Sequence, residues 1–276
     1  MTSEPKNILL TNDDGINSVG IWAAAEALAP LGKVWVVAPR TQATSFGRSN
    51  PVTSDGIIEE ITREVNGVTW HGYAAGASPA QCVLFSVEEV LPVRPDLVVS
   101  GINFGANTGV DITRSGTIGA ALEAANYGIP AMAVSLETAA ENTFLHNFEA
   151  DFSVAAYFTG LFARSLLETK FPPDVQVLKV EVPIGATQST PWHMTRLAPM
   201  SLYLPVFSSR KTLLEKSQMQ WRLQPDFSIF PEGTDSYTVF VDREVAVTPL
   251  SMDMTSRVPL ADLEEQMRRH ADFTGN

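Results

Sequence analysis

The stretch Ile8-Leu9-Leu10-Thr11-Asn12-Asp13-Asp14-Gly15 joins a short apolar run to two adjacent carboxylates and a glycine. An apolar run bounded by a turn signal predicts a buried strand, and Asn-Asp-Asp-Gly is typical of a turn. Residues 18–31 are rich in alanine and leucine and predict a helix. The two carboxylates therefore belong to a loop between a strand and a helix. In open parallel sheets this edge binds ligands, and adjacent anions repel unless a cation or a proton separates them.

The following segments repeat the alternation of strand and helix. Apolar runs predict strands at 33–38, 96–100 and 129–135, and a hairpin over 57–73 around Asn66-Gly67. Helices are predicted at 79–91 after the N-cap Ser78, at 116–127 and at 148–170, and Gly32 is predicted to cap the first helix. This order predicts an α/β fold, with a Rossmann-like, doubly wound and mostly parallel sheet in a catalytic domain over residues 1–182.

The sequence pattern changes over residues 183–276, where frequent prolines separate short predicted strands. Residues 235–250 (DSYTVFVDREVAVTPL) predict one long strand or a hairpin, and residues 260–270 predict a terminal helix. We expect a smaller β-rich extension, an arm of the kind that meets another subunit.

Composition narrows the classes of function. The chain has 276 residues, a net charge of -12 and 19 scattered Lys and Arg, so no basic patch favours a nucleic acid polymer. The single cysteine, Cys82, excludes an internal disulfide and a thiolate-rich metal site. No leader peptide or membrane-spanning run is evident, which predicts a cytoplasmic protein without a membrane partner. The four histidines (71, 146, 193 and 270) lack metal spacing.

Oxygen-bearing side chains follow three of the predicted strands. They are Asn12, Asp13 and Asp14 in the first loop, Thr44 and Ser45 in the second, and Asn103 and Asn107 in the third. Loops at one edge of a parallel sheet converge, and an all-oxygen set suits Mg²⁺ or Mn²⁺. The alternative for each loop is ordinary solvated polarity.

A second feature is the helix start at Ser115, Gly116 and Thr117. Free amides at a helix N-terminus, with hydroxyls beside them, form a site for an anion such as phosphate. An ordinary N-cap followed by close helix packing explains the same residues equally well.

With these residues in place, the chain resembles the survival protein E (SurE) family of metal-dependent nucleoside monophosphate phosphatases. The matching stretches are ILLTNDDGINSVG (8–20), VWVVAP (34–39), SPAQCV (78–83), DLVVSGINFGANTG (96–109), SGTIGAALEA (115–124) and GTDSYTVFVDREVAVTPL (233–250). The resemblance is densest from 8 to 135 and weakest from 136 to 232.

The resemblance implies a role for each matching residue. Asp13, Asp14 and Asn103 fall on the family's metal ligands, and Asp13 and Asp14 are the implied catalytic pair. In the family pattern A-P-D-x-x-x-S-G the serine ligand corresponds to Thr44, with Ser45 beside it, and Arg40 replaces the aspartate. Ser115, Gly116 and Thr117 match the phosphate-side loop, and Asn12 and Asn107 match supporting polar positions.

The implied activity is hydrolysis of nucleoside 5′- and 3′-monophosphates by metal-activated water, with one Mg²⁺ or Mn²⁺ per subunit and with short polyphosphate as a side substrate. The family also implies a homodimer or homotetramer. Two alternatives remain open: an aspartyl-nucleophile phosphatase, and a metal-dependent nucleotide-binding module without catalysis, which the changes at Arg40 and Thr44 motivate.

Overall fold

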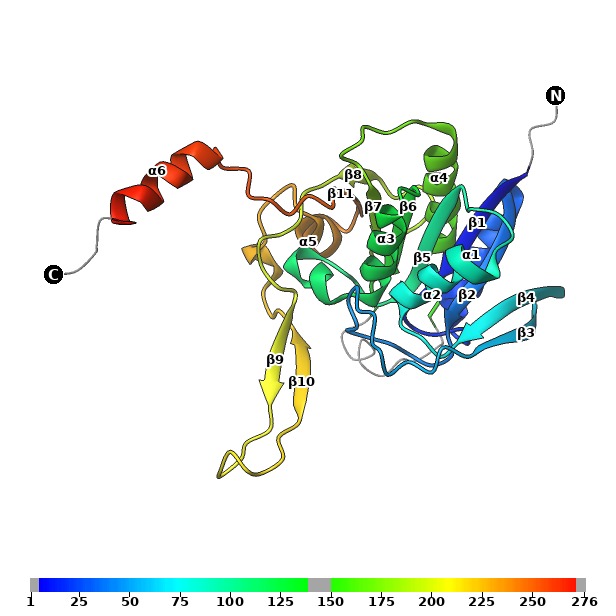
Figure 1. Cartoon of the computed structure of the whole chain (residues 1–276), viewed down its shortest axis with the longest axis horizontal. Helices are drawn as coiled ribbons and strands as arrows, with labels where there is room; N and C mark the ends of the chain where they lie inside the picture. Colours follow the sequence, from blue (N-terminus) through cyan, green and yellow to red (C-terminus); the bar gives the residue numbers. More distant parts are fainter. Residues whose placement is uncertain (1–4, 139–149, 272–276) are drawn as a thin grey trace.

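The strand predicted at the first motif, β1, is an interior strand of a nine-stranded sheet, next to the central strand β5 (Figure 1). The computed structural model describes residues 5–138 and 150–271. The order of the strands in the sheet is β3-β4-β2-β1-β5-β6-β7-β11-β8, and the pairs from β4 to β7 are all parallel. The strands are β1 (Lys6–Thr11), β2 (Gly32–Pro39), β3 (Ile58–Val65), β4 (Val68–Ala75), β5 (Leu97–Phe104), β6 (Ala131–Leu136), β7 (Val177–Val182), β8 (Trp192–Met194) and β11 (Val245–Leu250). The predicted α/β class with a mostly parallel sheet is confirmed.

The strand order places a topological switch point beside β1. From β1 the chain passes to β2 on one side, whereas β5 pairs with β1 on the other side. Crevices at the carboxyl ends of strands flanking such a reversal are the ligand sites of open α/β sheets. The Asp13–Asp14 loop follows β1 directly, so the fold brings this pair to that crevice.

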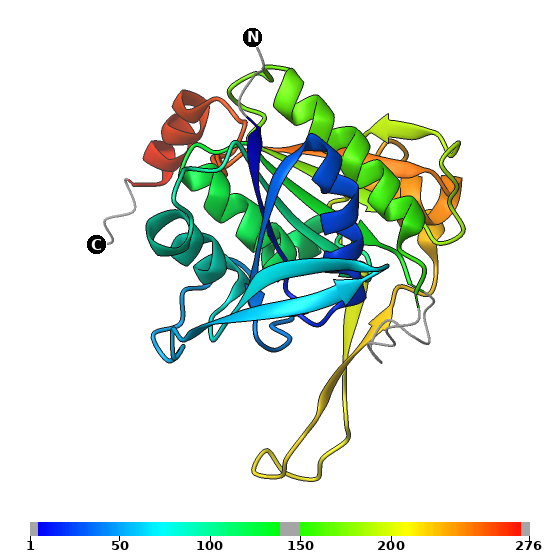
Figure 2. The same cartoon turned by 90° about the vertical axis from the view of Figure 1, so that its right-hand side faces the viewer.

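Helices cover both faces of the sheet, giving the three layers visible in Figure 2. The helices are α1 (Val19–Leu28), α2 (Pro79–Phe85), α3 (Gly116–Asn126), α4 (Ser153–Glu168), α5 (Asp235–Tyr237) and α6 (Leu260–Ala271). Ile8 and Leu10 of β1 pack into the core under α1 and α4, whereas Leu9 packs into the core under α2 and α3. This alternation is the two-residue period of a strand buried on both faces.

Short 3₁₀ and π segments continue three of the helices directly, as η1 (Ala29–Leu31), η2 (Ser86–Val90) and η5 (Thr238–Asp242). Two more, η3 (Gly109–Arg114) and η4 (Phe227–Ile229), lie in connecting segments. The predicted helix over 79–91 therefore ends as a π segment, after the Ser78–Gln81 capping box at its start. The hairpin predicted around Asn66-Gly67 is present as β3 and β4. The predicted start at Phe148 and residue His146 lie outside the described residues. Cys82 is buried in the core.

Gly32 ends the first helical stretch as predicted, since it is the C-cap of η1, which continues α1, but it does not adopt the left-handed conformation common at such caps. Gly32 has a φ of 164°, which is extended backbone, and it begins β2. A Cβ at this position would lie 2.2 Å from the carbonyl oxygen of Lys6 on the neighbouring strand. Glycine is required at this position because the backbones of β1 and β2 approach closely, and not because the chain turns there in a left-handed conformation.

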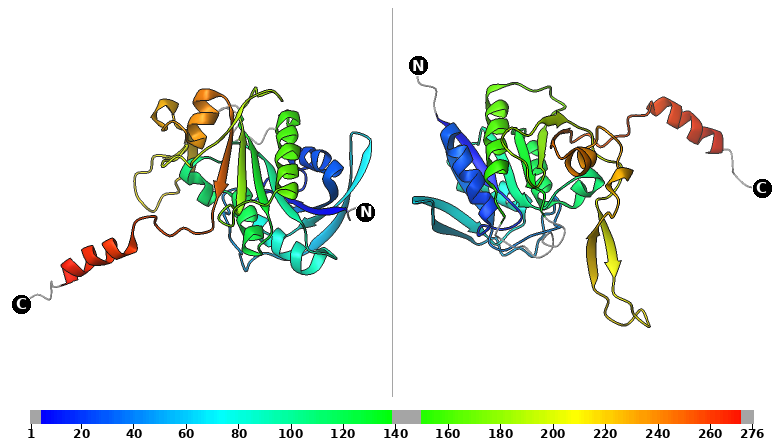
Figure 3. Two further views of the ribbon diagram at one scale, coloured as in Figure 1. Left: turned by 90° about the horizontal axis from the view of Figure 1, so that it is seen from above. Right: turned by 180° about the vertical axis from the view of Figure 1, so that it is seen from behind.

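The prediction of one long strand or hairpin over 235–250 is wrong for its first half. Residues 235–242 form α5 and η5, and only Val245–Leu250 form a strand, β11. The hairpin arm lies earlier instead, as β9 (Tyr203–Phe207) paired with β10 (Met219–Leu223). In Figure 3 this arm and α6 both project away from the body of the molecule.

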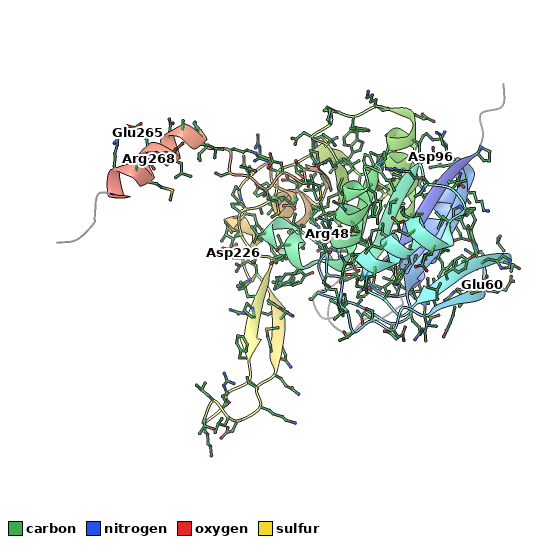
Figure 4. All side chains as sticks on the ribbon, viewed as in Figure 1. Arg48, Glu60, Asp96, Asp226, Glu265 and Arg268 are labelled. Atoms are coloured by element: carbon green, nitrogen blue, oxygen red, sulfur yellow. The ribbon has the colours of Figure 1, made fainter. Side chains whose placement is uncertain are left out.

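The division of the chain at residue 182 stays a prediction. β8 and β11 come from the second part and continue the main sheet, with β11 antiparallel to β7. The helix α6 carries two ion pairs between residues four apart, Glu264 with Arg268 and Glu265 with Arg269. One member of each pair, Arg268 and Glu265, is labelled in Figure 4. Within the described residues, no helix is both long enough and apolar enough to cross a membrane.

Candidate metal and phosphate site

Three loops meet around a cavity of about 290 Å³ at the carboxyl edge of the sheet. Asp13 and Asp14 come from the loop after β1, Thr44 and Ser45 from the loop after β2, and Asn103 from the end of β5. The structure therefore brings together all four residues predicted to hold a metal ion.

The carboxylate of Asp13 is fixed by residues at the start of α3. Its side chain is 4% exposed, and its Oδ1 accepts a hydrogen bond of 2.6 Å from the hydroxyl of Thr117. A Cβ on Gly116 would lie 2.8 Å from the Cβ of Asp13, so the start of α3 can approach this carboxylate only because residue 116 is glycine. The backbone oxygen of Asp13 also accepts from the N–H of Ala43, which ties the first loop to the second.

Asp14 is fixed by the glycine-rich segment. Its Oδ2 accepts a hydrogen bond of 2.9 Å from the N–H of Phe104. Burial and then the charge of Asp13 raise the pKa of Asp14 from 3.8 to about 8. Burial also raises the pKa of Asp13, against the lowering effect of its hydrogen bonds. The pair therefore needs a positive charge or a proton before both carboxyl groups can remain in the cavity.

The neutral oxygens complete the set. Asn103 donates its amide N–H₂ to the carbonyl of Gly105 at 2.8 Å, an orientation that turns the other end of the amide, Oδ1, away from that carbonyl. Thr44 is exposed, and its Oγ1 accepts a hydrogen bond of 2.8 Å from Gln42. Ser45 has a φ of 64°, the left-handed region that favours glycine, and the family pattern has glycine at this position.

The donor set fits a hard divalent cation. It comprises two carboxylates, an amide oxygen and hydroxyl oxygens around one cavity. Among residues 5–138 and 150–271, no three His, Cys, Asp or Glu side chains cluster in a way that could hold a metal ion. A site of mixed oxygen donors with only two carboxylates suits Mg²⁺ or Mn²⁺ better than a soft metal.

The residues predicted for phosphate divide into two groups. Ser115, Asn107 and Ser45 line the cavity. The contacts of the others point into the protein: Asn12 bonds to both backbone groups of Gly15 within its own turn, and Thr117 donates to Asp13. Ser115 also caps α3, because its hydroxyl accepts from the N–H of Ile118. The phosphate roles of these residues stay predictions.

The structure adds cavity residues that sequence reasoning missed. Asp111 and Arg114 of η3, Tyr203 of β9 and Trp221 of β10 line the same cavity. The aromatic residues lie far along the chain from the Asp-Asp-Gly motif. No spacing in the sequence connects them to it.

A second finding is a buried cluster of charges behind the glycine-rich loop. Lys179 is completely buried, with its Nζ 3.0 Å from Asp235 and 3.4 Å from Glu181. Burial raises the pKa of Glu181 to about 7, although the Lys179 charge opposes this, and the two carboxylates raise the pKa of Lys179 against the effect of burial.

This buried cluster positions the loop that faces the cavity. Glu181 accepts a hydrogen bond from the N–H of Asn107, and Asp235 accepts one from the N–H of Gly109, each at 2.9 Å. Asp235 also accepts from the N–H of Ala198. The cluster therefore joins β7, the loop after β5 and the C-terminal segment at one point below the site.

Arg48 is engaged elsewhere. Its Nε lies 2.6 Å from the buried carboxylate of Glu123 on α3, which anchors the loop after β2 to that helix (Figure 4).

Comparison with known proteins gives consistent results. The family model described as survival protein SurE matches residues 8–202. The chain is 40% identical to "5'-nucleotidase SurE" of Thermococcus gammatolerans, over 97% of this chain and 98% of that protein. It is 38% identical to "5'-nucleotidase SurE" of Methanocella arvoryzae, over 95% and 97% of the two chains. The crystal structure of the SurE protein from Aquifex aeolicus superposes with a TM-score of 0.73 at 29% identity, covering 96% of this chain and 99% of that one.

Proposed function

The chain belongs to the SurE family, and we propose that it is a divalent-metal-dependent 5′-nucleotidase, a phosphatase that releases phosphate from nucleoside 5′-monophosphates. Relatives that carry this name match nearly the full length of the chain. The observation that carries the proposal is the Asp13–Asp14 pair at the switch point of the sheet. Both carboxyl groups have raised pKa values, and neutral oxygen donors line the same cavity.

In this proposal Asp13, Asp14, Thr44 and Asn103 hold one Mg²⁺ or Mn²⁺ per subunit. A bound divalent cation supplies charge for the phosphoryl oxygens and lowers the pKa of an attacking water molecule. Asp13 and Asp14 are the proposed catalytic residues, because they would hold the cation that contacts the reacting phosphoryl group. Thr117 and the N–H of Phe104 keep the two carboxylates oriented.

The phosphate itself is assigned to the start of α3. Ser115, with the amides of Gly116 and Thr117, would hold the non-bridging oxygens, since helix N-termini attract anions. Asn107 and Ser45 would contribute further polar contacts, and Asn12 would keep the Asp-Asp-Gly turn in shape through its two bonds to Gly15. We extend the proposed substrates to nucleoside 3′-monophosphates and short polyphosphate.

The test is phosphate release from AMP, 3′-AMP and an aryl phosphate after treatment with EDTA, followed by addition of Mg²⁺ or Mn²⁺. We expect no release in EDTA and restored release with the metal ion. Asp13→Asn should abolish turnover, with the far-ultraviolet circular dichroism unchanged. Turnover retained in that variant would refute the metal assignment. Metal-dependent binding of AMP without phosphate release would favour a non-catalytic binding module.

We also propose that the protein forms a homodimer or a homotetramer. The arm exposes Leu213 and Leu214, which are 83% and 97% exposed. On α6 the exposed Leu260, Leu263 and Met267 recur at helical spacing along one stripe. Exposed apolar surfaces of this kind mark contacts with other chains. Sedimentation equilibrium at micromolar concentration tests this: a stable 30.0 kDa monomer would refute it.

A further inference from the structure

One part of the cavity wall has no role in the proposed chemistry, and it is aromatic and cationic. Arg114, Tyr203 and Trp221 line the same cavity as Asp13 and Asp14. We propose that Trp221 and Arg114 form the surface on which the nucleobase of the substrate stacks. This inference rests on the proposed function and names the residues that select nucleotides over phosphate esters that lack a base.

The stacking surface is already assembled by the protein itself. The guanidinium carbon of Arg114 lies 4.2 Å from the centroid of the Trp221 indole. Arg114 also forms an ion pair with Asp111, which is 7% exposed. The two planar groups are thereby held together before any substrate arrives, so that little side-chain freedom is lost on binding.

Hydrogen bonds join the start of the arm, at Leu202 and Tyr203, to the residues around this stacking surface. The Oδ2 of Asp111 accepts hydrogen bonds from the N–H groups of Leu202 and Tyr203, at 2.8 and 3.0 Å. The hydroxyl of Tyr203 donates to the carbonyl oxygen of Ala106 in the glycine-rich loop. Trp221 lies in β10, which pairs along its length with β9, beginning at Tyr203. The indole is therefore placed by contacts that reach back to the metal-side loop.

A nucleobase is the ligand part that this surface fits. Arg114 directly precedes Ser115, the residue assigned to the phosphate, so one chain segment reaches both parts of the ligand. Indole and guanidinium groups both stack on flat aromatic rings, and every base has such a face. The cavity of about 290 Å³ is just below the range for sites of drug-sized ligands, about 300–1,000 Å³, so it suits a ligand no larger than a single mononucleotide.

The experiment compares kcat/KM for AMP and for ribose 5-phosphate, which carries the same phosphoester without the base. Trp221→Ala should lower kcat/KM for AMP by about five- to 150-fold, chiefly through KM, because stacking on an aromatic residue has about this strength. For ribose 5-phosphate the loss should stay below about twofold. Trp221→Phe should recover most of the AMP activity, since it restores an aromatic face.

Arg114→Ala should reproduce the selective loss on AMP in smaller degree. Phe207→Ala is the matched control: it removes an exposed aromatic residue from the partner strand of the same hairpin, outside the cavity lining. A loss that is equal for AMP and ribose 5-phosphate in Trp221→Ala, or no loss for either, would overturn the proposal. An equal loss in Arg114→Ala would place that residue on the phosphate instead.

A binding measurement separates this inference from the proposed function. Adenosine has no phosphate to release, so its binding can be followed by saturation-transfer NMR whether or not the protein hydrolyses any ester. We expect a saturation signal from the adenine protons with the unmodified protein and its loss in Trp221→Ala. If no substrate were hydrolysed but this difference appeared, the phosphatase proposal would fail and the base site would stand. An adenine signal unchanged by Trp221→Ala, or absent from the unmodified protein, would refute the base site.

Discussion

Replacing Asp14 with asparagine should stabilise the metal-free protein while removing its response to metal ions. The pKa of Asp14 is about 8 in the folded protein because the carboxyl group is buried beside Asp13, against an ordinary value of 3.8. At neutral pH the folded state must therefore hold a proton that the unfolded chain has released, which costs folding free energy. Asparagine carries no charge and keeps an oxygen that can accept the hydrogen bond from the N–H of Phe104.

The magnitude follows from the difference between pH 7 and the ordinary pKa of 3.8. At 1.36 kcal/mol per pH unit the penalty in the unmodified protein is at most about 4 kcal/mol. Asp14 retains some contact with solvent, so we expect a gain of about 2 kcal/mol in the free energy of unfolding of Asp14→Asn. Because the pKa of Asp14 is higher in the folded protein than in the unfolded chain, the free energy of unfolding falls as the pH rises from 3.8 towards 8. We expect this fall to be weaker in Asp14→Asn, which has no carboxyl group to titrate at this position.

The assay is urea denaturation in EDTA at several values between about pH 5 and about pH 7, repeated with Mn²⁺. A metal ion at 100 times its Kd should stabilise the unmodified protein by about 2.7 kcal/mol and the variant far less. Comparing the two proteins at each pH cancels the contribution of Glu181, whose raised pKa gives a slope of the same sign. An Asp14→Asn protein that is less stable than the unmodified protein in EDTA, or that gains equally from Mn²⁺, would refute the reasoning.

Four further substitutions test the residues that build and support the site. Lys179→Met leaves two carboxylates buried without their cation, so we expect a loss of about 3–5 kcal/mol in the free energy of unfolding by urea denaturation, and an unchanged value would contradict the buried cluster. Gly116→Ala places a methyl group 2.8 Å from the Cβ of Asp13, so calorimetric titration should show weaker Mn²⁺ binding even where circular dichroism shows an intact fold. Thr44→Ala should lower Mn²⁺ affinity by about tenfold or more, whereas Ser45→Ala should change it little; the reverse order would make Ser45 the hydroxyl ligand.

Local patterns predicted the parts of the fold that depend on near neighbours in the chain. The run before Asp13 is a strand buried on both faces, and Asn66-Gly67 joins two paired strands, because side-chain period and turn chemistry act over a few residues. Ser78 and Ser115 cap the helices that follow them for the same reason. The meeting of the three polar loops was also predictable, since it needs only a parallel sheet.

Local patterns failed where a distant group decides the conformation. The alternating residues of 235–250 favour a strand, but Asp235 is completely buried, with its carboxylate on Lys179 and on backbone N–H groups of two other segments. That network outweighs the local preference and turns residues 235–242 into helical segments. Gly32 shows the same limit, because its nearest neighbour in space is the carbonyl of Lys6 on another strand.

The fold class, the family and the carboxylate pair with its oxygen partners could all be predicted from the amino-acid order, because each depends on residues close together in the chain or on one edge of a parallel sheet. The shared position of Trp221 and Arg114 on one wall of the cavity, and the buried Lys179 behind the glycine-rich loop, are known from the three-dimensional packing alone. These contacts join segments far apart in the chain, and they form only when the sheet, the arm and the C-terminal segment have packed together. No sequence periodicity or motif predicts these contacts.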